Sequence, residues 1–186
     1  MRIVAGKWKG RKLHELSGKV LASELRPTLD RVRETIFNIL THGIHYEVKG
    51  ARVLDLFCGT GALGFEALSR GASCACLIDN EKSSLSVASE NKNLFKAGKE
   101  VNLLKRDATK LNQNSDQDYN LVFLDPPYGR FLGEVAINQA LQKGWISKGA
   151  IIVWEENDAV CAPKELIMIR SKKIGKSCIN FLKRCE

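Results

Sequence analysis

The order of hydrophobic and polar positions along the chain predicts strands and helices in alternation. Short apolar runs typical of buried strands are each followed by a segment in which apolar residues recur with helical spacing. The predicted strands cover 51–57, 72–79, 101–107, 119–125 and 149–156. The predicted helices cover 61–71, 81–98 and 131–144, and a short helix follows the third strand. This alternation favours an α/β protein with a doubly wound, mostly parallel sheet and helices on both faces.

Both ends of the chain depart from this alternation. Residues 165–184 predict two strands joined by a tight turn at Gly175, which would close the sheet as a C-terminal antiparallel hairpin. Residues 26–40 predict an amphipathic helix with Thr28 as its N-cap. Residues 1–16 are basic and punctuated by glycine, which suggests a small hairpin or an extended arm.

The composition is that of a single domain of ordinary size. With 186 residues, of which 44% are hydrophobic, the chain can bury a substantial core. We expect a short basic N-terminal arm over residues 1–26 ahead of one domain over residues 27–186. No stretch is apolar and long enough to cross a membrane, and the six cysteines include no C-x-x-C pair. These features predict a cytoplasmic protein with reduced thiols and no metal site, and we take a monomer as the default.

Positive charge is concentrated at the two ends of the chain. The formal net charge is +8. Residues 1–33 contain nine Lys/Arg against three Asp/Glu, and residues 164–186 contain seven against two, whereas residues 34–163 contain thirteen against sixteen. Such a distribution favours a polyanionic partner, nucleic acid first, over an evenly solvated surface.

A glycine-rich loop follows the first predicted strand. Gly59, Gly61 and Gly64 match the G-x-G-x-x-G spacing of nucleotide-binding loops, a pattern that is weak on its own. Asp55 stands four residues before Gly59, and a carboxylate so close to the loop disfavours a pyrophosphate. It suits a ligand with positive charge instead. S-adenosylmethionine, with its sulfonium and α-ammonium groups, fits both features and needs no phosphate site.

Acidic residues also follow the second and third predicted strands. Asp79 lies twenty residues after Gly59, where a carboxylate can accept both ribose hydroxyls of a bound nucleoside. Asp107 could accept a hydrogen bond from an adenine amino group. Either residue could instead be a helix N-cap. Because the carboxyl ends of parallel strands share one edge of a sheet, three strand ends that each carry an acid predict one nucleoside site.

The fourth predicted strand ends in Asp125-Pro126-Pro127-Tyr128. Proline lacks an N–H group and has a fixed φ, and it pushes the residue before it into extended backbone. The segment should therefore form a rigid, extended lip beyond the strand end. It could be no more than a strand terminator with a packed tyrosine. Its expected place beside the glycine loop and the acids favours a role in chemistry.

The combination of D-x-F-x-G-x-G on the first strand with D-P-P-Y on the fourth resembles Rossmann-type methyltransferases that act on exocyclic amino nitrogens. The segments MRIVAGKWKGRKL, RPTLDRVRETIFNIL, LDLFCGTGALGFEALSRGA and FLDPPYG are similar to the RsmD-type small-subunit ribosomal RNA guanine-N2 methyltransferases, over nearly the whole chain. The resemblance implies an S-adenosylmethionine-dependent enzyme that methylates N2 of a guanine in 16S rRNA, free or within the small ribosomal subunit. One departure is Asp79, where the family commonly has glutamate.

The resemblance also implies roles for individual residues. The expected cofactor site comprises Asp55, Phe57, Gly59, Thr60, Gly61, Asp79, Asn80, Asp107, Ala108 and Asp125. The expected catalytic residues are Asp125, Pro126, Pro127 and Tyr128. An exocyclic amine is a poor nucleophile because its lone pair is delocalised into the ring. Asp125 and the carbonyl of Pro126 would each accept an N–H and orient the lone pair, and Tyr128 would stack on the base.

The basic N-terminal region then acquires a role in binding RNA. The residues expected to contact RNA are Arg2, Lys7, Trp8, Lys9, Arg11, Lys12, Arg26, Arg31 and Arg33. Phosphate contacts carry no sequence information, so a chain this small would recognise the shape of its RNA. Trp8 could stack on a base or merely pack the arm. Arg31 or Arg33 could instead pair with Asp30 or Glu34 on the same helix.

Other functions stay open on the sequence alone. A DNA adenine-N6 or cytosine-N4 methyltransferase would use the same lip but usually needs further residues for sequence readout. A protein-glutamine methyltransferase typically has asparagine at the position of Asp125. An RNA-binding protein without turnover would need neither the lip nor the loop. A nicotinamide oxidoreductase is disfavoured by Asp55 and by the lip.

Overall fold

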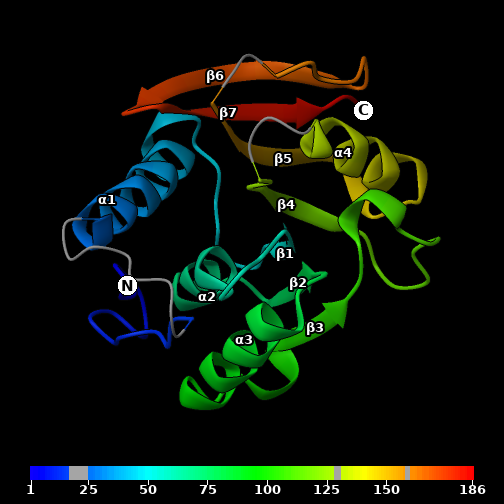
Figure 1. Cartoon of the computed structure of the whole chain (residues 1–186). Coiled ribbons are helices and arrows are strands. Elements are labelled where there is room, and N and C mark those ends of the chain that lie inside the picture. Colours follow the sequence, from blue (N-terminus) through cyan, green and yellow to red (C-terminus); the bar gives the residue numbers. More distant parts are fainter. Residues whose placement is uncertain (17–24, 128–130, 158–159) are drawn as a thin grey trace.

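A central sheet organises the molecule, and its seven strands lie in the order β3-β2-β1-β4-β5-β7-β6 within the described residues (Figure 1). The computed structural model describes residues 1–16, 25–127, 131–157 and 160–186, with only the backbone for 25–29. The strands are β1 (Arg52–Leu56), β2 (Cys74–Asp79), β3 (Val101–Lys105), β4 (Tyr119–Leu124), β5 (Ile146–Glu156), β6 (Leu166–Ile174) and β7 (Ser177–Arg184).

The pairing of the strands confirms the predicted doubly wound sheet. β1 pairs in parallel with both β2 and β4, so the strand order reverses direction at β1. β3 and β5 extend the parallel part on either side. β7 then inserts antiparallel between β5 and β6, which is the predicted C-terminal hairpin. In sheets of this kind ligands bind beyond the carboxyl ends of the strands, where the order reverses.

Helices cover both faces of the sheet, as the sequence predicted (Figure 1). The helices are α1 (Leu25–Asn38), α2 (Ala62–Ser69), α3 (Lys82–Leu94) and α4 (Leu132–Gln142), with short turns η1 (Ile39–Gly43), η2 (Gly98–Glu100) and η3 (Ala108–Lys110). Residues of α1, α2 and α3 share one hydrophobic cluster with the sheet, and α4 and η3 share the other. The prediction of Thr28 as an N-cap is wrong, because α1 begins three residues earlier and already includes Thr28; its side chain lies outside the described residues.

Large side chains on each strand alternate between the two clusters. Phe123 on β4 meets Phe37 of α1, with ring centroids 5.7 Å apart. Trp154 on β5 is fully buried on the opposite face. A Cβ atom on Gly133, in the first turn of α4, would lie 2.6 Å from the indole of Trp154, so this helix packs directly on the ring. Burial on both faces explains why the strand sequences are apolar nearly throughout.

The N-terminal arm folds back on itself and packs against the sheet domain. Arg2 and Lys12 form an antiparallel bridge, which bears out the predicted small hairpin. Ile3 and Leu13 belong to the same buried cluster as α1 and α2. The indole of Trp8 stacks on Phe95, just beyond α3, with ring centroids 4.7 Å apart. The arm is thus anchored on the domain by side chains that are part of the main hydrophobic core.

The sequence analysis also made predictions about the cysteines and about membrane-spanning segments. All six cysteines are free thiols, and Cys58 and Cys76 are buried. Among the described residues, no helix is long and apolar enough to cross a membrane.

Candidate functional site

The glycine-rich loop turns sharply between β1 and α2. Phe57 adopts a left-handed φ of 63°, which is costly for an aromatic residue, and Gly61 follows with a φ of 79°. A Cβ on Gly61 would lie 2.7 Å from the ring of Phe65, and one on Gly64 would lie 2.4 Å from Cδ2 of Leu77. Glycine therefore lets the turn close and lets α2 pack tightly on β2, as the spacing of the motif predicted.

Asp55 lies beneath this loop, near the carboxyl end of β1. Only 2% of the residue is exposed, and its Oδ2 accepts a hydrogen bond from the backbone N–H of Gly64 at 3.2 Å. Burial raises the pKa of Asp55 to about 7, the hydrogen bond from Gly64 opposes this, and the charge of Asp79 adds to it. A buried carboxyl with one weak partner is poised to accept positive charge from a ligand.

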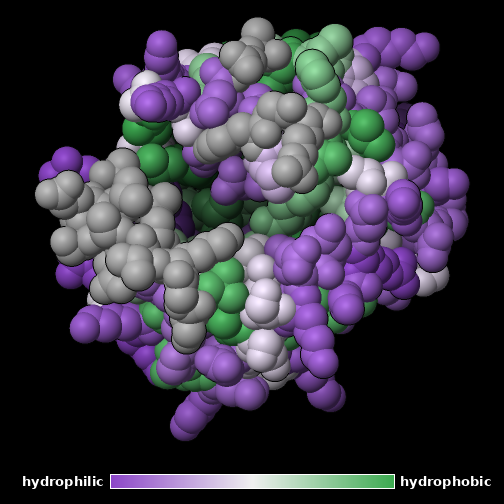
Figure 2. Space-filling view, in the orientation of Figure 1, coloured by the Kyte–Doolittle hydropathy of each residue, from purple (hydrophilic) through white to green (hydrophobic). Residues whose placement is uncertain are grey.

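A cavity of about 250 Å³ opens beside the loop. Figure 2 shows it as a hollow on this face, bordered in part by hydrophobic side chains. Its lining residues come from the arm, α1, the loop and the ends of β4 and β5: Met1, Leu16, Val32, Arg33, Ile36, Asp55, Phe57, Cys58, Gly59, Thr60, Ala62, Leu63, Asp125 and Glu155. The cavity therefore lies at the carboxyl edge of the sheet, where the strand order reverses.

Asp125 stands at the mouth of this cavity, directly after β4. The residue is exposed, yet the protein around its carboxylate, together with the charges of Glu155, Asp55 and Glu156, raises its pKa well above the ordinary value for aspartate. The three neighbouring carboxylates disfavour a further negative charge at Asp125, even though the residue is open to solvent. Pro126 beside it is buried, which fixes the backbone of the lip.

The second predicted part of the cofactor site lies along the neighbouring strand ends. Asp79 Oδ2 accepts a hydrogen bond from the backbone N–H of Gly59 at 2.8 Å, which ties the end of β2 to the loop. Asp107 accepts hydrogen bonds from both the N–H and the hydroxyl of Thr109, so it caps η3. These bonds lower the pKa of Asp107 and keep it charged. The alternative of an N-cap is thus confirmed for Asp107, and its side chain is still partly exposed.

The structure brings some predicted site residues together and leaves others apart. The cavity below the glycine loop is lined by Asp55, Phe57, Gly59, Thr60 and Asp125. The other residues predicted to bind the cofactor lie at the ends of β2 and β3, on the same edge of the sheet, but they do not line the cavity: Asp79, Asn80, Asp107 and Ala108. Gly61 does not line the cavity; a side chain at this position would collide with Phe65 and Leu77. Tyr128, predicted to stack on a base, lies outside the described residues.

A buried asparagine connects the arm with the loop. Asn91 of α3 is fully buried, and its Oδ1 accepts a hydrogen bond from the N–H of His14 at 2.7 Å. Its Nδ2 donates to the carbonyl of His14 and to the carbonyl of Thr60, the latter at 3.1 Å. One side chain therefore holds a loop residue of the cavity and the arm in fixed relation, a role that the sequence did not reveal.

Several cavity residues were missed from the sequence. Val32 and Ile36 were recognised as the apolar stripe of a helix, but not as a wall of the site. Met1 and Leu16 of the arm gave no signal, because only the fold brings them to the cavity. Glu155 could have been found, since the acids at residues 155–156 end a predicted strand just as Asp55, Asp79 and Asp125 do.

The structure argues against the predicted RNA contact of Arg33. Its side chain is only 4% exposed, and its Nη2 donates to Asp30 at 2.7 Å and to the carbonyl of Arg2. Its Nε lies 3.5 Å from the carboxylate of Glu66, which is fully buried. Glu66 also accepts hydrogen bonds from the backbone of Val4 and Ala5 of the arm. Arg33 is therefore buried in a charged network and does not reach a phosphate.

Other predicted RNA contacts of the arm are also occupied within the protein. Trp8 is buried against Phe95, so it packs the arm and presents no face to a base. Lys7 pairs with Glu100 at 2.9 Å. Arg11 donates to the carbonyl of Leu94 at 2.6 Å and lies over the ring of Phe95.

The rest of the predicted cations remain available at the surface. Lys9, Lys12 and Arg31 are exposed, and the described part of the chain offers them no ion pair. Arg2 is exposed and lies 3.7 Å from Asp30. The side chain of Arg26 lies outside the described residues.

The chemistry of the cavity fits a cationic nucleoside ligand. Carboxyl groups at the ends of β1, β4 and β5 line the cavity, and its α1 wall combines the apolar side chains of Val32 and Ile36 with Arg33. The charge of Arg33 is paired with Asp30 and Glu66. The described residues contain no group of three or more His, Cys, Asp or Glu placed to hold a metal ion. A sulfonium and an ammonium group would be stabilised beside such acids, and an aliphatic chain would pack against Val32 and Ile36.

Comparison with known proteins agrees with this geometry. The model of the family described as "Conserved hypothetical protein 95" matches residues 1–183. The chain is 36% identical to the ribosomal RNA small subunit methyltransferase D of Escherichia coli over 99% of this chain and 90% of that protein. It is 37% identical to the protein of the same name from Haemophilus influenzae, over 94% and 89%. A solved structure of the Escherichia coli protein yhhF superposes with a TM-score of 0.85 at 36% identity, over 100% of this chain and 98% of that one.

Proposed function

Since this chain belongs to the family described as conserved hypothetical protein 95, with small-subunit rRNA methyltransferases among its relatives, we propose that it methylates the exocyclic N2 amine of a guanine in small-subunit ribosomal RNA, using S-adenosylmethionine. The observation that carries the proposal is the position of Asp125. It stands at the mouth of an acid-lined cavity that the glycine loop and Asp55 form beneath it. An activated methyl donor held in the cavity would lie next to a hydrogen-bond acceptor for the amine.

Three groups of residues would hold the cofactor. Asp55 and the loop at Gly59–Gly61 would face the amino-acid part, with Val32 and Ile36 of α1 covering its aliphatic chain. Asp79 would face the ribose, although it also accepts the N–H of Gly59. Asp107 and Ala108 would border the adenine. When bound, S-adenosylmethionine supplies a methyl group made electrophilic by the sulfonium.

Asp125 and the carbonyl of Pro126 would orient the guanine amine. Each accepts one N–H, which turns the nitrogen lone pair towards the methyl group and stabilises the positive charge that develops on nitrogen. Pro126 and Pro127 have no N–H of their own to compete for these acceptors. The proton leaves the nitrogen after methylation, to Asp125 or to water. The raised pKa of Asp125 makes it a better proton acceptor than an ordinary aspartate.

Transfer of labelled methyl groups tests the proposal directly. Labelled S-adenosylmethionine would be offered with the protein to small ribosomal subunits, to naked small-subunit rRNA and to duplex DNA, each from cells that lack the enzyme. The product would be digested and its modified nucleoside identified. We expect N2-methylguanosine from the rRNA or the subunits, and comparison of the two shows whether ribosomal proteins complete the substrate.

The Asp125→Asn variant is the matched control for this assay. It keeps the size of the side chain and one acceptor oxygen, but it cannot take up a proton. N6-methyladenine from DNA would overturn the choice of substrate in favour of a DNA enzyme. Cofactor binding without transfer to any of the three substrates would overturn the proposed reaction and leave the fold unaffected.

A further inference from the structure

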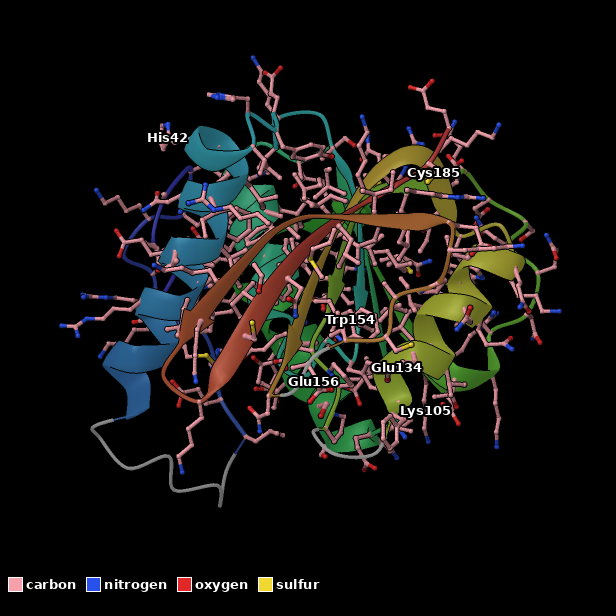
Figure 3. The ribbon with its side chains drawn as sticks, turned by 90° about the horizontal axis from the view of Figure 1, so that it is seen from above. His42, Lys105, Glu134, Trp154, Glu156 and Cys185 are labelled. Carbon is pink, nitrogen blue, oxygen red and sulfur yellow. The ribbon has the colours of Figure 1, made fainter. Side chains whose placement is uncertain are left out.

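A second and larger cavity lies at the opposite end of the sheet from Asp125. Its volume is about 540 Å³, and it is formed by the end of η1, the segment that follows it, and strands β5, β6 and β7. The residues that line it are Gly43, Ile44, His45, Tyr46, Gly149, Ile151, Ile169, Arg170 and Lys183. We call it the hairpin groove. Figure 3 shows His42 and Cys185 at this end of the molecule and Glu156 and Trp154 towards the other.

The hairpin groove is positively charged. Arg170 and Lys183 both line it, and its described lining includes no carboxylate. A Cβ on Gly43 would lie 2.8 Å from Nη1 of Arg170, so the absence of a side chain there leaves room for the guanidinium. The hydroxyl of Tyr46 donates to the carbonyl of Asn120, and burial raises the pKa of Tyr46 to about 12, so the phenol stays neutral. The groove thus presents two cations and no competing anion.

Strand β6 extends this charge along the edge of the sheet. Seven consecutive residues of β6, from Ile167 to Lys173, are exposed, which means that both faces of this edge strand are open to solvent. Arg170, Lys172 and Lys173 lie among them. Lysine on an edge strand is also a common protection against unwanted strand pairing. That general role does not account for the groove, or for Lys183 of β7, which also lines it.

The cations of the hairpin differ from Lys7 and Arg33 in what they contact and resemble Lys9, Lys12 and Arg31. Arg33 and Lys7 are paired with carboxylates of the protein, as described above. In the described part of the chain, no ion pair involves Arg170, Lys172, Lys173 or Lys183. A cation without an internal partner keeps its full interaction for an external anion, whereas a paired one has to give up a bond first.

The register of the sheet connects the hairpin groove with the catalytic lip. Ile151 of β5 pairs with Lys183, and Glu156 of β5 pairs with Cys178, which in turn pairs with Lys173. The cations of β6 therefore run from the level of the groove to the level of the carboxyl end of β5. Ile151 and Glu155 are four residues apart, which corresponds to about 13 Å along a strand. That distance spans two to three phosphates of an RNA strand.

We propose that the hairpin groove and the exposed edge of β6 form a second RNA-binding surface, on which the phosphate backbone of the substrate follows β6 towards the lip. Arg170 and Lys183 would bind phosphate in the groove, and Lys172 and Lys173 would continue the contact. The proposal rests on the proposed function, because it takes RNA as the substrate. It adds the C-terminal hairpin to the exposed N-terminal cations Lys9, Lys12 and Arg31 as a place where RNA is bound.

Exposed apolar residues on the same strand raise the question of a protein partner. Ile167, Met168 and Ile169 are 61%, 44% and 43% exposed. They would suit a ribosomal protein better than a phosphate chain. We favour RNA because the groove beside them has two unpaired cations, and because residues 164–186 carry a net charge of +5. The test below separates the two partners.

The test compares RNA binding by the double variant R170Q/K183Q with that of the wild type, using a naked small-subunit rRNA transcript at several salt concentrations. Loss of two phosphate contacts should lower the slope of log K against log salt by about 1.5 and weaken binding at least tenfold at moderate salt. Gly43→Ala, which displaces the guanidinium of Arg170 without removing charge, should weaken binding by a smaller factor. K99Q/K143Q is a control with the same change in net charge and no residue in the groove.

Cofactor affinity and thermal stability are measured on all variants. An unchanged salt slope in R170Q/K183Q, with normal folding, would overturn the proposal. So would normal affinity for naked rRNA together with reduced activity on assembled subunits, which would point to a protein partner at Ile167–Ile169. Failure of the wild type itself to bind or methylate rRNA would instead overturn the proposed function.

Discussion

The guanidinium of Arg33 and the carboxylate of Glu66 lie 3.5 Å apart, and both side chains are almost completely buried. Glu66 is shared by three parts of the chain, since it also binds the backbone of the arm at Val4 and Ala5 and the side chain of Arg70. The pair therefore joins α1, α2 and the arm at one point beside the cavity below the glycine loop, which Arg33 also lines. Such a buried charge is stable only while its partner is present.

We predict that Arg33→Gln destabilises the protein and leaves the RNA contacts of its surface intact. Removal of Arg33 leaves the buried charge of Glu66 with Arg70 and two backbone N–H groups of the arm as its remaining partners. The loss of one buried charged partner should lower the free energy of unfolding by about 1–3 kcal/mol. Chemical denaturation checks this value. Arg31→Gln, on the exposed side of α1, is the control and should change stability by less than about 0.5 kcal/mol. If R33Q kept wild-type stability and lowered the salt slope of RNA binding, the structural role would be refuted.

Asp125→Asn should abolish methyl transfer and preserve cofactor binding. Only the ionised carboxylate stabilises the positive charge that develops on the amine nitrogen, and the pKa of Asp125 is raised by its surroundings and the neighbouring acids. The transfer rate at saturating cofactor should therefore increase with pH through this raised pKa and then level off. Single-turnover rates across a pH series, with calorimetry for cofactor affinity, measure both quantities. A comparable loss of cofactor affinity in D125N would mean that Asp125 mainly holds the cofactor.

Asp55 should make the ligand-free protein less stable as the pH rises. The pKa of Asp55 is raised from 3.8 to about 7 in the folded state, so between these values the unfolded chain ionises while the folded one stays protonated. The free energy of unfolding then falls by up to about 4 kcal/mol between pH 4 and pH 7. Asp55→Asn, which can still accept from Gly64, should remove this part of the pH dependence. Thermal melts of both proteins at pH 5 and pH 8 provide the comparison.

Cofactor binding provides a second test of the ionisation of Asp55. A cationic ligand favours the ionised form of Asp55, so binding near pH 6 should release a proton. Calorimetry in two buffers of different ionisation enthalpy detects that proton. The release should be smaller in D55N, and the affinity lower. Equal proton release in both proteins would show that another group accepts the positive charge.

Asn91→Leu should lower cofactor affinity although Asn91 does not line the cavity. The substitution removes three hydrogen bonds, one of them to the carbonyl of Thr60 and two to His14, and leaves buried backbone groups without partners. We expect at least a tenfold weaker affinity and faster hydrogen exchange in the arm. Asn91→Asp keeps the acceptor for the N–H of His14 but loses the donor to the carbonyl of Thr60. This variant should therefore hold the arm in place better than it holds the loop. Wild-type affinity in N91L would remove the connection that we infer.

The fold was largely predictable because its signals are local. Each strand of the parallel sheet is a short apolar run, and the glycine loop and the lip mark two strand ends by chemistry that hardly depends on context. The acids at Asp55, Asp79 and Asp125 could be placed at one edge from the topology alone. Thr28 was mistaken for the N-cap of α1, which begins at Leu25, since a favourable cap residue can also occur inside a helix.

The surface roles of the cations could not be predicted in the same way. Charge counts treat Arg33 and Lys172 alike, although one is buried against Glu66 and the other is exposed. What separates them is a contact between distant parts of the chain, and local patterns carry no information about it. Glu66, in the middle of an apolar helix sequence, was the available hint, because a buried acid requires a partner.

The long-range bonds of the arm affect when the catalytic site can form. Lys7 pairs with Glu100, 93 residues along the chain, and His14 binds Asn91, 77 residues along. The arm therefore lacks the surface on which it packs until the chain has been synthesised as far as Glu100. Met1 and Leu16 complete the wall of the cavity only after that point. A nascent chain should accordingly acquire its affinity for the cofactor late in synthesis, however early its amino terminus appears.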